Sequence, residues 1–62
     1  MHPLNATEAA QSMIRAHGAR AAQHCRHMIE KMAKRGDHQG YETWRMILDA
    51  VRVLRAAEAG TE

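Results

Sequence analysis

Residues 40–57, GYETWRMILDAVRVLRAA, constrain the fold of this 62-residue chain more than any other stretch. On a helix at about 100° per residue, the bulky apolar side chains of this stretch fall on one broad face. That face comprises Tyr41, Trp44, Ile47, Leu48, Val51 and Leu54. A second apolar stripe runs beside it and consists of Met46, Ala50, Val53 and Ala57. A helix with one partner needs one stripe, so this helix is predicted to meet two partner surfaces.

Three helices are predicted along the chain. Asn5 followed by Glu8 is an N-capping pattern, which predicts a helix over residues 6–16. A helix over residues 20–35 is predicted from apolar residues at the spacing of a packed seam. These residues are Ala21, Cys25, Met28 and Met32. The third helix is predicted over residues 38–57, with Trp44 in the core between the helices.

The connections between the predicted helices are short. Gly18 predicts a helix end and a turn, and a single helix kinked at Gly18 is the alternative. His17 is expected to cap the first helix, with a polar contact across the fold as its alternative role. Gly36 and Asp37 suit a helix end and the next N-cap, and such a tight connection makes antiparallel neighbours. Since no stretch alternates with the period of a strand, the predicted fold is all-α, a short N-terminal helix and an antiparallel hairpin in one domain, residues 1–62.

The small size of the chain favours self-association. One core below about 70 residues rarely supplies more than about 3–5 kcal/mol. Cys25 is the only cysteine, so no intrachain disulfide adds stability. A homodimeric helix bundle is therefore predicted. Its interface is expected to consist of Met46, Ala50, Val53 and Ala57.

Charge and hydropathy limit the partners and the location. No apolar run approaches the roughly 18 residues of a membrane span, and no signal peptide opens the chain, so no membrane association is expected. The single thiol of Cys25 suits a reducing cytoplasm. Nine basic residues are interleaved with seven acidic ones, which favours a mixed solvated surface over a continuous nucleic-acid-binding stripe.

One set of residues extends in order over most of the chain, across residues 9–54: His17-Gly18, Ala21, His24, Gly36-Asp37, Gly40, Trp44, Ile47-Leu48 and Ala50. In these residues the chain resembles short, uncharacterised helical proteins common in alphaproteobacteria. It departs from them at Ala22, where relatives often carry proline after the His-Gly turn. The middle of the chain also resembles one tetratricopeptide-type helix pair, although one pair is not a solenoid. The resemblance implies a bacterial helical protein and brings no activity with it.

Residues 24–28, HCRHM, hold the strongest candidates for metal binding or catalysis. Histidine, cysteine and methionine are metal ligands, but no single helix face gathers three of these side chains. A nucleophilic Cys25 would need an accessible thiolate and an oriented base, whereas Cys25 points into the predicted seam. We therefore predict no catalytic residue, no metal site and no cofactor, and we expect a protein that is not an enzyme.

The sequence alone leaves three functions open. The first, which the second stripe favours, is a non-enzymatic protein-interaction module or regulator that self-associates or binds a protein target. The second is a nucleic-acid-binding regulator with a basic face drawn from Arg15, Arg20, Arg26, Lys31, Lys34 and Arg35. The third is a metal or redox sensor that uses His24, Cys25 and His27. The first is preferred, because the third helix is apolar where a recognition helix would need base-reading side chains.

Overall fold

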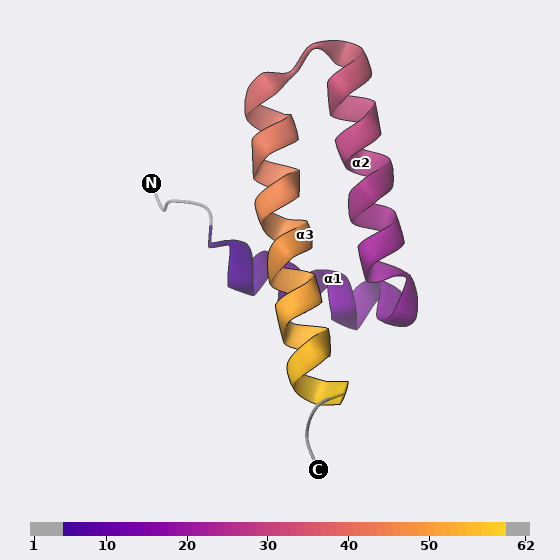
Figure 1. Cartoon of the computed structure of the whole chain (residues 1–62). Coiled ribbons are helices and arrows are strands. Elements are labelled where there is room, and N and C mark those ends of the chain that lie inside the picture. The colour runs from indigo at the N-terminus through magenta and orange to yellow at the C-terminus, as the bar shows by residue number, and fades with distance from the viewer. Residues whose placement is uncertain (1–4, 60–62) are drawn as a thin grey trace.

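The computed structural model describes residues 5–59, with residues 58 and 59 described by their backbone alone. The elements in chain order are α1 (Ala6–His17), a 3-10 turn (Gly18–Arg20), α2 (Ala21–Arg35) and α3 (His38–Ala59) (Figure 1). No strand occurs in this part of the chain, so the all-α prediction is confirmed. The predicted domain also includes residues 1–4 and 60–62, which lie outside the described residues.

α1 begins at a side-chain cap. The backbone of Asn5 is extended, and its Oδ1 accepts hydrogen bonds from the amides of Thr7 at 3.0 Å and Glu8 at 3.2 Å. These amides are among those that a helix start leaves without an intrahelical partner. The N-cap predicted for Asn5 is thus confirmed. α1 ends at His17, one residue beyond the predicted end.

Gly18 breaks the chain between α1 and α2. Its φ of 57° and ψ of −126° are the torsions of the first central residue of a type II′ turn, which glycine adopts readily. The Gly18 amide donates to the carbonyl of Ile14 and closes α1. Arg20 has φ −94° and ψ 5°, so α2 begins at Ala21 and not at Arg20 as predicted. The chain therefore turns at this point, and the alternative of one kinked helix is wrong.

Gly36 and Asp37 connect α2 to α3. Gly36 has a left-handed backbone, with φ 73°, and its amide donates to Ala33 while the Asp37 amide donates to Met32. This pairing is a Schellman motif, which satisfies the last carbonyls of α2. Asp37 then caps α3, since its Oδ1 accepts from the Gly40 amide at 2.9 Å. The predicted roles of both residues are confirmed.

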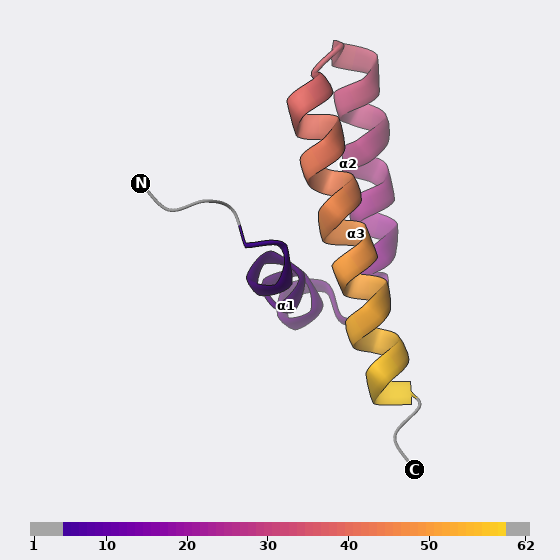
Figure 2. The same ribbon diagram turned by 60° about the vertical axis from the view of Figure 1, so that its left-hand side comes forward.

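α2 and α3 run side by side in opposite directions, and α1 crosses behind α3 (Figure 1). In the turned view of Figure 2, α1 stands to one side of the α2–α3 pair and is seen nearly end-on. α1 packs mainly against α3 and less against α2. One face of the α2–α3 pair is therefore covered by a crossing helix.

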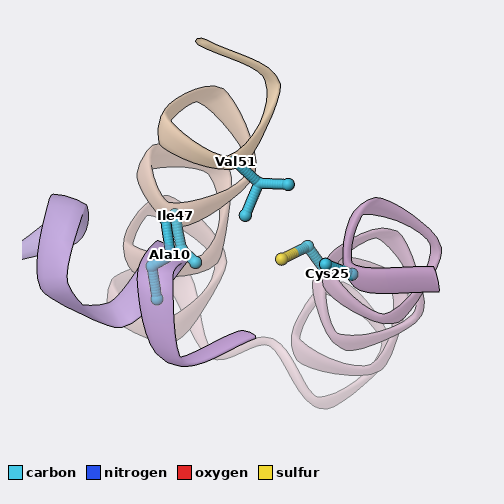
Figure 3. Close-up of a cluster of buried hydrophobic side chains, with 5 residues drawn as sticks. Ala10, Cys25, Ile47 and Val51 are labelled. Atoms are coloured by element: carbon cyan, nitrogen blue, oxygen red, sulfur yellow. The ribbon is translucent and has the colours of Figure 1, made fainter. Parts of the chain in front are cut away.

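The core is a cluster of buried side chains from all three helices. Its members are Ala10 of α1, Ala21 and Cys25 of α2, and Ile47 and Val51 of α3. In Figure 3, Ala10 lies beside Ile47, and the sulfur of Cys25 points toward Val51. Small side chains predominate at the centre, which lets the helices approach one another closely.

Trp44 differs from its predicted position. The prediction placed it in the core, but the side chain is half-buried and packs against the outside of the core cluster. The cluster itself is built around residues no larger than Ile47. An indole is too large for the narrow space between closely approaching helices, so its ring stays at the margin.

Gly40 has a packing role that the sequence interpretation missed. A Cβ at this position would lie 2.6 Å from Met32 Sδ and 2.8 Å from Asp37 Oδ2. Such distances are far shorter than normal contacts between these atoms. Glycine therefore lets the first turn of α3 approach Met32 while Asp37 keeps its capping position.

The inter-helix connection can be tested by substitution. Gly36→Val is expected to destabilise the fold by about 1–2 kcal/mol or more, because a β-branched residue is strained at positive φ. Asp37→Ala is expected to cost about 1 kcal/mol through loss of the cap. Urea unfolding followed by far-UV circular dichroism measures both effects. Gln39→Ala, an exposed change in the same turn, is the control. Unchanged unfolding midpoints for both variants would contradict these assignments.

Candidate interaction surface

Two large apolar side chains lie exposed on α3. Met46 is 52% exposed and Val53 is 66% exposed. They are seven residues apart, so they lie about two turns, or roughly 10 Å, from each other along the helix. We call the strip of α3 that carries Met46 and Val53 the outer edge.

The direction of the outer edge follows from the buried residues of α3. Ile47 and Val51 face the core and are 4% and 0% exposed. At about 100° per residue, Met46 and Val53 point well away from the direction of Val51. They are therefore carried on the side of α3 that faces away from α2. The N-terminal half of α1 extends past α3 on that same side (Figure 1).

The two alanines of the predicted interface have different surroundings. Ala50 is half-buried and packs against the core cluster that contains Ala10 of α1. Ala50 therefore has an intrachain contact, and its place in an interface between two copies stays a prediction. Ala57 is exposed near the end of α3 and can offer only a methyl group to a partner. Most of the exposed apolar area thus belongs to Met46 and Val53.

Charged residues flank the outer edge on one side. Asp49, Arg45 and Arg52 are all exposed on α3. The helical repeat places Asp49 next to the stripe and the two arginines one step further round. The guanidinium of Arg45 also lies 5.8 Å from the centroid of the Tyr41 ring. An apolar centre with a rim of both charge signs is typical of protein interfaces.

Three aromatic rings meet where α1, α2 and α3 come together. The rings of His17 and His24 are stacked, with centroids 4.2 Å apart and planes inclined by 16°. The Trp44 ring meets His24 edge-on, with centroids 5.8 Å apart. Of the two roles considered for His17, a contact across the fold is therefore the one observed. Helical periodicity could not have predicted this stack, because Gly18 breaks the helix between the two histidines.

The three residues considered for metal binding or redox sensing, His24, Cys25 and His27, lie in different environments. Cys25 is fully buried, and burial raises the pKa of its thiol, although Arg26 opposes this effect. His24 is engaged in the ring stack, whereas His27 is exposed on α2. Among residues 5–59, no three His, Cys, Asp or Glu side chains are placed to hold a metal ion.

The candidate basic face is divided among several elements. Arg15 lies on α1 and Arg20 in the 3-10 turn, while the remaining members lie on α2. On α2 the basic residues extend around much of the outer circumference, and Glu30 lies among them. The cations are therefore dispersed, and no single helix presents them as one stripe.

The comparisons with known proteins give no relatives. No family model matches the chain, and no match was found among the curated proteins or the solved structures that were compared. Within the described part of the chain, every helix is too short or too polar to cross a lipid bilayer.

The His24 environment predicts a loss of stability in acid. Partial burial, then the neighbouring charges of His17 and His27, hold the pKa of His24 below its ordinary value of 6.5. The unfolded chain therefore binds a proton at this residue before the folded chain does, and stability falls as the pH drops below about 6.5. Thermal unfolding at about pH 7.5 and about pH 5.5 should show a lower midpoint in acid. His24→Gln should reduce this difference, and His38→Gln, on an exposed residue, should preserve it. Equal midpoints for the wild type at both pH values would contradict the prediction.

Proposed function

We propose that this chain is a small, non-enzymatic protein-interaction module that self-associates as a homodimer through the outer edge of α3. The observation that supports this most strongly is the exposure of Met46 and Val53 on the side of α3 away from α2. Exposed apolar side chains at helical spacing are typical of contact surfaces. Burying them against a second copy removes apolar surface from water at about 25 cal/mol per Å².

The spacing of these two residues suits a two-fold symmetric contact. Two copies of α3 can pack antiparallel about an axis that passes level with Asp49 and Ala50. Met46 of each copy then lies opposite Val53 of the other, so one patch is complementary to itself. The antiparallel hairpins of both copies would together supply four long helices.

The charges beside the outer edge also suit a second copy. The two-fold rotation places the charged flank of α3 next to the same flank of α3 in the second copy. Asp49 of one copy then lies within one helical turn of Arg52 of the other, and the reciprocal pair forms by symmetry. Charge complementarity of this kind fixes orientation more than it adds affinity. It favours a second copy over a partner of unknown surface.

The two alternative functions have less support. A nucleic-acid-binding regulator would need its cations on one surface, and the basic residues from Arg15 to Arg35 are dispersed. A metal or redox sensor would need Cys25 to be accessible, and its thiol is buried. The lone thiol is compatible with a reducing cytoplasm, which we propose as the location.

Sedimentation equilibrium over a range of protein concentrations tests the proposal. We expect the wild type to form a dimer with a dissociation constant on the order of micromolar, since the apolar contact is small. Val53→Glu, and separately Met46→Glu, should weaken the dimer at least about tenfold by burying unpaired charges. The variants should keep the helical circular dichroism of the wild type, because both side chains are exposed.

Ala33→Glu is the matched control for these variants. It introduces the same charge at an exposed alanine of α2, away from the outer edge. It should leave the dissociation constant unchanged. A wild type that stays monomeric at millimolar concentration, or a Val53→Glu variant that dimerises normally, would overturn the proposal. A salt-dependent mass increase with DNA would instead favour the nucleic-acid alternative.

A further inference from the structure

A polar cavity lies beside the His17–His24 stack, at the junction of α1, the 3-10 turn and α2. Its volume is about 430 Å³, and it is lined by His17, Arg20, Gln23, His24 and His27. One of these side chains carries a permanent positive charge, three can acquire one, and none is a carboxylate. The self-association proposed above uses none of these residues.

The stack gives this cavity a fixed wall. His17 at the end of α1 and His24 of α2 are held 4.2 Å apart, and Trp44 of α3 supports His24 edge-on. Arg55 of α3 donates to the Gly18 carbonyl at 3.3 Å and joins the turn to α3. The imidazoles are therefore positioned by all three helices before any ligand arrives, which reduces the entropy lost on binding.

The electrostatics of the cavity are one-sided. The charged and titratable groups around the stack are Arg20 from the turn, His27 from α2 and Arg55 from α3. α1 contributes His17 itself. Protonation of both stacked rings places two positive charges at very short distance, with no acid in the cavity wall to neutralise them. The lowered pKa of His24 agrees with this environment.

We propose that this cavity binds a small dianionic oxyanion, of the sulfate or phosphate class, and that binding is coupled to proton uptake by the histidines. The imidazolium N–H groups of the histidines and the guanidinium of Arg20 act as donors to the oxyanion. The positive charges in the cavity oppose protonation of the histidines, and a bound dianion neutralises them. Binding of the anion therefore favours binding of protons.

Sulfate is the appropriate probe, because it stays a dianion between about pH 5 and pH 8, where histidine titrates. The histidine ring protons are followed by NMR while sulfate replaces chloride at constant ionic strength, which holds nonspecific screening fixed. We expect saturable shifts of the His17, His24 and His27 signals at about pH 6. The affinity should fall as the pH rises from about 6 to about 8, by up to about tenfold per pH unit for each proton taken up.

The key variant is Arg20→Gln combined with His27→Gln, since both side chains are exposed and Arg20 makes no capping hydrogen bond. Its matched control is Arg35→Gln combined with His38→Gln, which changes the same residue types at exposed positions outside both the cavity and the outer edge. The key variant should lose at least about tenfold in sulfate affinity, and the control should keep it. Shifts that do not saturate, an affinity independent of pH, or equal loss in both variants would overturn the proposal. So would binding of a short DNA duplex through these residues when sulfate does not bind.

Discussion

Three helix surfaces meet at Ala10, and the size of its side chain sets how closely they can approach. Ala10 of α1 is fully buried with Ala21 and Cys25 of α2 and with Val51 of α3. A larger residue at this crossing would push α1 outward and open the core to water. Because the central side chains are small, the apolar area buried is modest, and a chain of this length has little stability to lose. The position of the ring stack at the junction of the three helices depends on this crossing.

The features that the sequence predicts well are the local ones. Asn5, Gly36 and Asp37 act through hydrogen bonds to residues within a few positions of themselves, so their roles can be inferred without the tertiary structure. The buried face of α3 can also be inferred, because Ile47 and Val51 repeat at helical spacing. Helical content follows from the same patterns.

The features that the sequence does not predict depend on the direction of the α1 axis relative to α2 and α3, which is set at the Gly18 turn. That direction decides that Trp44 stays at the margin of the core and that His17 meets His24. Helical periodicity predicts which face is buried within one helix. It gives no information about the angle between the helices on either side of the turn. Glycine marks the turn without specifying the crossing angle, which packing around the small core residues determines.

The buried thiol of Cys25 makes the interior of this protein accessible to kinetic measurement. Its sulfur lies among core residues contributed by all three helices (Figure 3). Burial keeps reagents away from the sulfur and also raises the pKa of the thiol, which disfavours the reactive thiolate. An alkylating reagent can react only during transient separation of the helices. When closing is fast relative to reaction, the labelling rate is proportional to the equilibrium constant for opening. Cys25 is the only cysteine of the chain, so this rate reports the opening of one defined site without any substitution.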